Sequence, residues 1–311
     1  MITVAGVSPS LDLIYPVDAL TLGRVHRVSN VVRTAGGKAL NMGRAATTMG
    51  ADCTVVAILG GFTGERLAAM LAQEQMALVL VSSPAETRTC VSIASATTGA
   101  LTEIYEEAVA VSDSVWQDFQ RQLTVTMASR PGWLSISGRV PSNSVDAVAE
   151  LVRLGHDHRR RVAVDTHDQA LPGAVAAAPE VVKINRSEAA QLLGVAEDSD
   201  LGGMATSIRS RTGGLVILTD GTAGSVAVDG DQRLEVQGPE LVGAYPVGSG
   251  DSFLGGLLAV LDGGGKLVDA MRTATACGIA NAMVPGQGHF DPDLVHRIIP
   301  AVRVSALSPV Q

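Results

Sequence analysis

A glycine-bounded turn at residues 246–253, with the sequence PVGSGDSF, runs directly into the apolar helical stretch Leu254–Leu261. Such a turn places free backbone N–H groups and a helix N-terminus at one point, where they stabilise a phosphate or another oxyanion. The Asp251 carboxylate at the same point can accept a hydroxyl proton, and a base beside an anion site is what phosphoryl transfer to an alcohol requires. The alternative is an Asp or Ser cap on an ordinary helix.

A second glycine turn, Ala35–Asn41, also opens a helix. Its glycines allow the backbone to approach a polyhydroxy ligand closely, and the Asn41 amide can both donate to hydroxyl groups and accept from them. Lys38 can meet an anionic group on such a ligand. The alternative interpretation is a plain joint between a loop and a helix.

The elements that must position these turns alternate between short apolar runs and longer segments of helical periodicity. This alternation is typical of βα units, so we expect an α/β fold with a doubly wound, mostly parallel sheet flanked by helices. The expected strands are Ile2–Val7, Thr54–Leu59, Trp133–Ile136, Val162–Val164, Val181–Ile184 and Leu215–Leu218. The expected helices are Leu40–Met49, Gly64–Gln75, Ser144–Leu154, Arg186–Leu193, Leu201–Arg211 and, as the longest, Leu267–Met283.

Two segments, at about residues 11–33 and 88–107, do not fit this alternation, because they read as extended chain with turns. We expect them to form a small β-sheet lid within a single domain that spans residues 1–311. The last residues, SALSPVQ, are expected to be a frayed tail.

Charge and composition exclude several classes of partner. The formal net charge is −8, which offers no basic surface for nucleic acid, and an anionic ligand must therefore be held by local charges. The three scattered cysteines favour a reducing compartment, and neither a basic leader nor a long apolar run is present. We therefore expect a cytoplasmic protein with no membrane partner.

Several familiar motifs are absent from the sequence. GxxxxGK[ST] does not occur and the glycines around Gly248 do not complete GxGxxG, so a P-loop NTPase or a Rossmann dehydrogenase is disfavoured. HExxH and GxSxG are also absent, which leaves zinc and serine-hydrolase chemistry without support.

Taken together, the two turns resemble the signatures of the ribokinase-like (PfkB) carbohydrate kinases. The late signature of that family appears as Gly248-Ser249-Gly250-Asp251, and the early one as residues 36–41, GGKALN, with Ala39 where a third glycine is usual. Further matches follow in the family's order at residues 8–12, 60–64, 183–188, 219–224 and 277–282. The resemblance therefore runs over nearly the whole chain.

This resemblance implies a role for each matched position. Substrate-binding roles are implied for Asp12, Gly37, Lys38, Asn41, Arg88, Cys90, Ser137 and Gly138. Binding of ATP is implied for Lys183, Asn185, Thr219, Gly221, Gly224 and Asn281, and coordination of Mg²⁺ for Asn185 and Glu188. Catalytic roles are implied for Asp251, as the base, and for Gly248, Ser249 and Gly250.

Within the family, residues 86–90 (ETRTC) and 101–104 (LTEI) resemble the branch of 1-phosphofructokinase and tagatose-6-phosphate kinase. A sugar phosphate needs a cationic partner that a free sugar does not need. Lys38 and Arg88 are the natural clamp, with Arg27 as a third candidate. The turn at residues 137–141, SGRVP, has altered residues where this branch has Gly-Ser-Leu-Pro, and the sequence does not separate fructose 1-phosphate from tagatose 6-phosphate.

The expected reaction is in-line transfer of the γ-phosphoryl group of ATP to a sugar hydroxyl, with Mg²⁺ on the nucleotide phosphates and the lid excluding water. Two alternatives stay open. One is a kinase of the same family that acts on a free sugar or a nucleoside, and the other is a catalytically silent sugar-phosphate-binding protein. A homodimer through the lid is a further expectation.

Overall fold

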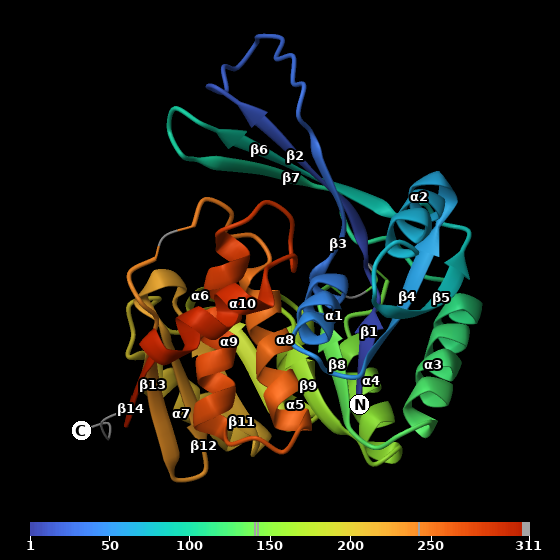
Figure 1. Ribbon diagram of the computed structural model, residues 1–311. Coiled ribbons are helices and arrows are strands. Elements are labelled where there is room, and N and C mark those ends of the chain that lie inside the picture. The colour runs from blue at the N-terminus through green and yellow to red at the C-terminus, as the bar shows by residue number, and fades with distance from the viewer. Residues whose placement is uncertain (140, 142, 242, 307–311) are drawn as a thin grey trace.

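The structure, a computed structural model, describes residues 1–139, 141, 143–241 and 243–306 (Figure 1). Its strands are β1 (Ile2–Gly6), β2 (Ser10–Val17), β3 (Val32–Gly36), β4 (Cys53–Gly60), β5 (Ala77–Ser83), β6 (Arg88–Ser95), β7 (Leu101–Tyr105), β8 (Trp133–Ser137), β9 (Arg161–Asp165), β10 (Val181–Asn185), β11 (Leu215–Thr219), β12 (Ser225–Asp229), β13 (Gln232–Gln237) and β14 (Arg303–Ala306). Its α-helices are α1 (Lys38–Thr48), α2 (Gly61–Leu71), α3 (Asp113–Ala128), α4 (Ala147–Asp157), α5 (Ala170–Ala176), α6 (Arg186–Leu193), α7 (Leu201–Thr212), α8 (Ser249–Asp262), α9 (Leu267–Ala282) and α10 (Pro292–Ile298), with short 3₁₀ helices at η1 (Gly221–Ala223) and η2 (Ile299–Ala301).

A ten-stranded sheet forms the centre of the fold, in the order β14-β13-β12-β11-β10-β9-β8-β1-β4-β5. Neighbouring strands from β11 to β5 pair in parallel. Strands β12, β13 and β14 extend one edge of the sheet in antiparallel fashion. The prediction of a mostly parallel α/β sheet is confirmed.

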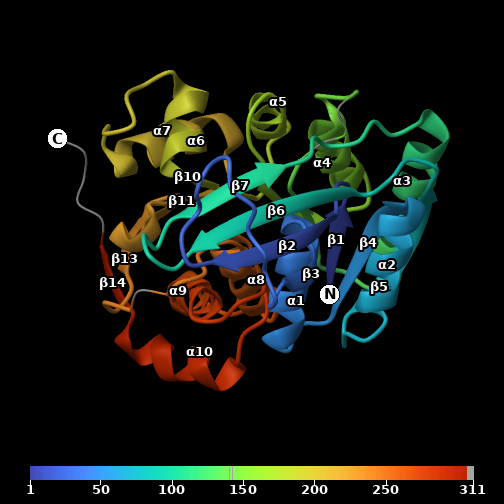
Figure 2. The ribbon, with the colours of Figure 1, turned by 90° about the horizontal axis from the view of Figure 1, so that it is seen from above.

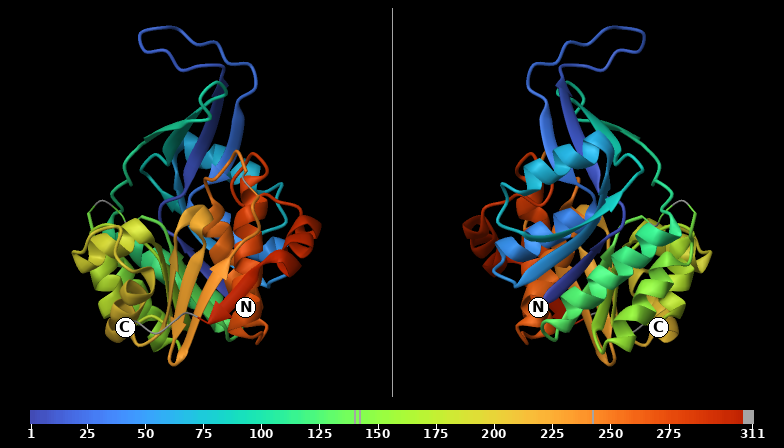
Figure 3. Two further views of the ribbon diagram at one scale, coloured as in Figure 1. Left: turned by 90° about the vertical axis from the view of Figure 1, so that its left-hand side faces the viewer. Right: turned by 90° about the vertical axis from the view of Figure 1, so that its right-hand side faces the viewer.

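Alternate residues of the strands face two helical layers, because successive side chains of a strand point to opposite faces. On β4, Val55, Ala57 and Leu59 belong to one hydrophobic cluster with residues of α1, α2, α8, α9 and α10, whereas Val56 and Ile58 belong to a second cluster with residues of α3 and α4. Helices α5, α6 and α7 cover the second face further along the sheet. Figure 3 shows the sheet between these two layers.

A separate four-stranded sheet, in the order β3-β2-β6-β7, lies across the carboxyl-terminal edge of the large sheet (Figure 2). Strands β2 and β6 pair in parallel, and β3 and β7 pair antiparallel to them on either side. The loop of residues 18–31, between β2 and β3, projects beyond this small sheet (Figures 1 and 3). The prediction of a small sheet from these two segments is confirmed.

The structure adds elements that the sequence patterns did not predict, namely β5, α3, α5, β12, β13, β14 and α10. In α3, which is as long as α9, the buried residues Val115, Phe119, Leu123 and Met127 form one narrow stripe, and most of the other residues are polar. The expected frayed tail is wrong for its first two residues, because Ser305 and Ala306 pair with β13; residues 307–311 lie outside the described part. Within the described chain, none of the helices is long and apolar enough to cross a membrane.

Candidate active site

The carboxyl ends of the parallel strands bring four polar side chains to one edge of the large sheet. Ser137, Asp165, Asn185 and Thr219 are the last residues of β8, β9, β10 and β11. These strands are neighbours in the sheet, and ligands in open α/β sheets bind at this edge. Three of the four were predicted as site residues, and Asp165 was not.

The predicted phosphoryl-binding turn forms the start of α8. Gly248 is the N-cap residue with φ +84°, a conformation that favours glycine, so the first-turn amides are not capped by its side chain. Asp251 lies in this first turn, is only 7% exposed and accepts a hydrogen bond from Asn41 Nδ2 at 2.8 Å. Burial raises the pKa of the Asp251 carboxyl, and the charge of Asp165 adds to this rise, whereas Lys38, Asn41 and Lys183 oppose it.

Asp165 joins two lysines beside this turn. Its Oδ1 lies 2.6 Å from Lys38 Nζ and its Oδ2 lies 2.7 Å from Lys183 Nζ. Burial opposes the charge of Asp165, but the two lysines outweigh burial and lower its pKa to about 2. Lys183 Nζ also lies 2.7 Å from the point that a Cβ on Gly250 would occupy. The two predicted lysines and the predicted glycine turn are therefore adjacent.

The second glycine turn leads from β3 into α1. Gly37 is the N-cap of α1, with φ +100°, and Lys38 and Asn41 lie in the first turns of the helix. Asp12, on β2 beside β3, accepts a hydrogen bond from Ser10 Oγ at 2.6 Å. Burial and the charge of Asp251 raise the pKa of Asp12 to about 6 against the lowering effects of Ser10, Arg88 and Gly37. The small sheet thus places Asp12 within electrostatic reach of Asp251.

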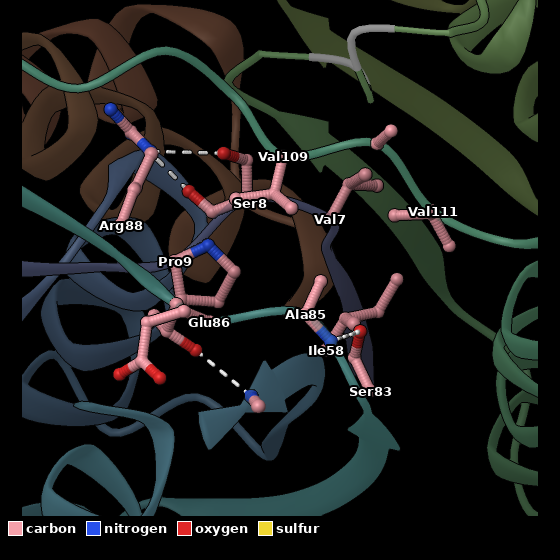
Figure 4. A pocket seen from close by; sticks show the side chains of 13 residues that line it. Val7, Ser8, Pro9, Ile58, Ser83, Ala85, Glu86, Arg88, Val109 and Val111 are labelled. Carbon is pink, nitrogen blue, oxygen red and sulfur yellow. Dashed lines mark hydrogen bonds between the residues drawn. The ribbon is translucent and has the colours of Figure 1, made fainter. Parts of the chain in front are cut away.

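Arg88 stands at the start of β6, on the side of the site away from α8. Its guanidinium donates to Ser8 Oγ at 3.0 Å, to Cys90 Sγ at 3.1 Å and to the Glu106 carbonyl at 3.4 Å. A pocket of about 330 Å³ lies next to it, lined by residues 7–9, 58, 60, 83, 85–88 and 109–111 (Figure 4). The pocket reaches Arg88, but its lining does not include Lys38 or Asp251.

Beside the same pocket, Glu86 lies over the start of α2. Its carboxylate accepts a hydrogen bond from the Thr63 amide at 2.6 Å, and the side chain and the amide of Thr63 together lower the pKa of Glu86. Arg27, the third predicted cation, is exposed in the loop of residues 18–31. The structure therefore brings Lys38, Asp12 and Asp251 together, places Arg88 and Cys90 at the edge of that group, and leaves Arg27 apart from it.

The predicted Ser137–Pro141 turn follows β8, and its residue 140 lies outside the described part of the chain. The Gly138 amide donates to the Asp165 carbonyl at 2.9 Å, and Thr166 Oγ1 donates to the Gly138 carbonyl at 3.0 Å. Arg139 forms an ion pair with Glu107 at 2.9 Å. These contacts fix the turn against the end of β9, next to Lys38.

The predicted nucleotide side lies at the ends of β10 and β11. Asn185 and Glu188 form a capping box on α6, because Asn185 Oδ1 accepts from the Glu188 amide and Glu188 Oε2 accepts from the Asn185 amide, each at 2.8 Å. Thr219 lies opposite Asn185 across the β10–β11 pair. Gly221 and Gly224 bound the η1 turn that follows.

The capping box still leaves one Glu188 oxygen for a metal ion. Among the described residues, no three His, Cys, Asp or Glu side chains gather as a metal site. Mg²⁺ in phosphoryl-transfer sites commonly uses one or two carboxylates with waters and substrate phosphates, and the Glu188 carboxylate fits that donor set. The charge of Glu188 also contributes to raising the pKa of Lys38 against the effect of burial, together with Asp165 and Asp251.

Asn281, on α9, contacts the glycine turn that starts α8. It is buried, and its Nδ2 donates to the Val247 carbonyl at 2.9 Å and to Ser249 Oγ at 3.2 Å. Its Oδ1 accepts from Ser252 Oγ at 3.1 Å and from the Gly288 amide at 2.8 Å. Through these hydrogen bonds the Asn281 amide holds the turn before α8 in place.

Two residues of this site were missed by sequence reasoning. Asp165 directly follows a predicted strand, a position that commonly lines a site, and this was its only local signal. Arg44 lies one helical turn after Asn41, yet it is only 5% exposed. A buried arginine needs partners from other parts of the chain, which a single sequence does not reveal.

Comparison with known proteins gives consistent similarities over almost the full length. The model of the pfkB family of carbohydrate kinases matches residues 4–293. A tagatose-6-phosphate kinase of Staphylococcus epidermidis is 27% identical over 310 residues, covering 98% of this chain and 99% of that protein. The tetrameric inhibited form of phosphofructokinase-2 from Escherichia coli superposes with a TM-score of 0.86 at 24% identity, over 96% of this chain and 98% of the other. A Thermotoga maritima protein named as a possible 1-phosphofructokinase gives a TM-score of 0.88 at 19% identity, over 99% of both chains.

Proposed function

Because this chain belongs to the pfkB family of carbohydrate kinases, we propose that it transfers the γ-phosphoryl group of ATP to a hydroxyl of a ketohexose phosphate, either fructose 1-phosphate or tagatose 6-phosphate. One observation carries the proposal. A buried carboxylate, Asp251, lies in the glycine-capped first turn of α8, within reach of the Lys38–Asp165–Lys183 cluster. A base and an anion site at one point are the parts that this reaction requires.

In the proposed reaction, Asp251 accepts the proton of the attacking sugar hydroxyl. The first-turn amides of α8 stabilise the oxygens of the transferred phosphoryl group, and Lys183, beside Gly250, adds positive charge there. The Asn41 hydrogen bond holds the Asp251 carboxylate in place. Since burial raises the pKa of Asp251, we expect kcat to fall as the pH decreases through that raised value.

Magnesium is proposed as the metal, with the Glu188 carboxylate as its protein ligand and Asn185 as the residue that orients Glu188. A bound Mg²⁺ supplies charge neutralisation to the nucleotide phosphates. Thr219, Gly221 and Gly224 are proposed to bind the nucleotide beside it. Asn281 is proposed to act through the turn that it fastens.

The phosphate of the substrate is proposed to bind Lys38 and Arg88. We expect Arg88→Ala to raise KM for the sugar phosphate by about ten- to a hundredfold, because a charge-assisted hydrogen bond contributes about 1.5–3 kcal/mol, and to change kcat much less. Steady-state kinetics measures this split. Arg33→Ala is the matched control, since Arg33 lies on the same small sheet and bonds only the nearby Val31 carbonyl in the described structure. An unchanged KM in the Arg88 variant would remove Arg88 from the clamp.

The substrate class is tested by ADP release with ATP and Mg²⁺, using fructose 1-phosphate, tagatose 6-phosphate, fructose 6-phosphate, free fructose and ribose as acceptors. Turnover with one or both of the first two acceptors, abolished when EDTA removes the metal, is the expected result. Turnover with free sugars alone would reject the phosphate clamp but retain the kinase. Binding of a sugar phosphate without ADP release would indicate a silent binding protein.

A homodimer through the small sheet is also proposed. Leu22 and Val25 in the projecting loop are 90% and 81% exposed, and Ile104 on the edge strand β7 is 61% exposed. Apolar side chains on an open sheet edge favour pairing with a second copy. Sedimentation measures the mass of the protein in solution, and the mass of two chains is the expected result.

A cytoplasmic location is proposed because the three cysteines are free and buried.

A further inference from the structure

A buried arginine, Arg44, lies next to the base without touching it. Its Nε and Nη2 donate to the two oxygens of Glu74 at 2.8 and 2.9 Å, which forms a bidentate pair. The remaining contacts go to the Ala35 carbonyl at 2.8 Å, the Gln287 carbonyl at 2.9 Å and Asn41 Oδ1 at 3.4 Å. One side chain therefore joins β3, α1 and the segment that follows α9.

The contact with Asn41 decides which way the Asn41 amide points. A guanidinium only donates hydrogen bonds and a carboxylate only accepts them. Arg44 on one side of Asn41 therefore requires the amide oxygen, and Asp251 on the other side then receives the amide nitrogen at 2.8 Å. Residues three apart on a helix share a face, which is why Arg44 can reach Asn41.

The contact with Gln287 supports the phosphoryl-binding turn from behind. A Cβ on Gly248 would lie 2.7 Å from Gln287 Cβ, so the segment that contains Gln287 packs directly against the N-cap of α8. Arg44 holds that segment through the Gln287 carbonyl. The same guanidinium therefore contacts Asn41, which bonds the base, and the Gln287 segment, which packs against the glycine turn of α8.

We propose that Arg44 is a positioning residue of the kinase site, which presents the nitrogen end of the Asn41 amide to Asp251 and holds the Gln287 segment against Gly248. This inference rests on the proposed function for its kinetic consequences, but its structural part is independent of activity. Glu74 is the counter-ion that keeps the guanidinium buried in place.

The kinetic test uses Arg44→Met. We expect kcat to fall by about ten- to a hundredfold, the range for loss of a charge-assisted contact, with KM for both substrates changed less than threefold. The acid limb of the kcat profile should move to higher pH, because the Asn41 hydrogen bond lowers the pKa of Asp251. Lys38, Asp165, Lys183 and Asp12 face Asp251 from other elements and are unchanged in the variant.

A double-variant comparison separates positioning from general destabilisation. If part of the effect of Arg44 passes through Asn41, then Asn41→Ala combined with Arg44→Met loses less kcat than the product of the two single losses. Arg160→Met is the matched control, because Arg160 is a partly buried arginine that precedes β9, at the end of the strand opposite to Asp165, and donates to the Met127 carbonyl. It should leave kcat unchanged. Additive losses, or an unchanged kcat in Arg44→Met, would overturn the proposal.

A readout without catalysis keeps the two proposals distinguishable. The chain contains five asparagines, so ¹⁵N-asparagine labelling gives five side-chain amide pairs that single substitutions can assign. We expect the Asn41 pair to shift or broaden in Arg44→Met and to stay unchanged in Arg160→Met. If Arg44→Met does not fold, Arg44→Lys retains the charge and the stem and should show the same shift. An unchanged Asn41 pair overturns the positioning role, whereas absence of ADP release by the unmodified protein rejects only the proposed function.

Discussion

Replacing Asp251 with asparagine is expected to lower kcat by about a hundred- to ten-thousandfold, the range for loss of a general base, while KM for either substrate changes little. The amide keeps the shape of the side chain and an oxygen that can still accept from Asn41 Nδ2, but it cannot take the hydroxyl proton. Initial-rate kinetics at saturating ATP measures the loss. Near-normal turnover would remove Asp251 from the role of base.

The same variant has a stability signature that distinguishes a lost base from a damaged fold. Burial raises the pKa of Asp251 in the folded state, so above that pKa the charged carboxylate makes folding less favourable. A neutral asparagine removes this cost, and we expect the melting temperature at pH 7 to stay the same or rise. Asp269→Asn, in the exposed first turn of α9, is the control, and it should change neither kcat nor the melting temperature appreciably.

Removal of the Asp165 carboxylate is expected to have the largest effect on stability. Asp165→Ala leaves Lys38 and Lys183 without the buried charge between them, and breaking such a pair typically costs about 3–5 kcal/mol. Urea unfolding at pH 7 measures this loss. Asp52→Ala removes a carboxylate from an exposed pair with Arg130 and should change the free energy of unfolding by about 0–1 kcal/mol.

The effect of Asp165 should also depend on pH in a defined direction. Its folded-state pKa is lowered to about 2, so its stabilising contribution is present above the unfolded value of about 3.9 and is lost as the pH falls towards 2. The difference between the wild type and Asp165→Ala should therefore shrink between about pH 4 and pH 2. A loss under about 1 kcal/mol at pH 7, or a difference that does not change over this interval, would show that the lysines find other partners.

Local sequence patterns predicted most of the fold and many residues of the candidate site. The βα units were predictable because strands such as β4 have a run of apolar residues bounded by turns, and the two glycine turns carry a signal in their own residues. Strand β14 was not predictable, because its partner β13 lies far back in the chain and the strand itself is short and mostly exposed. Helix α3 was missed because its apolar stripe is narrow and shares the helix with poor helix formers, including Thr124 and Val125.

The long-range contacts of buried charged side chains were the part of the site that the sequence did not predict. Asp165 meets Lys38 across 127 residues, and Arg44 meets Gln287 across 243 residues. Neither separation leaves a local pattern, because the contacts arise only when the strand ends and the segment after α9 converge. Sequence reasoning therefore predicted the groups that face a ligand more fully than the groups that hold them.

The Glu86 carboxylate limits the helix N-termini at which the phosphate groups of a ligand can bind. Four helices, α1, α2, α6 and α8, begin around the candidate site, and each N-terminus attracts anions to a similar degree. Glu86 already occupies the start of α2, and Glu188 occupies the start of α6. In the described structure the starts of α1 and α8 have no side-chain cap, and the Asp251 carboxylate in the first turn of α8 accepts from Asn41 instead. Glu86 and Glu188 therefore occupy two of these four helix starts, and we expect the phosphate groups of a ligand to bind at the other two, the starts of α1 and α8.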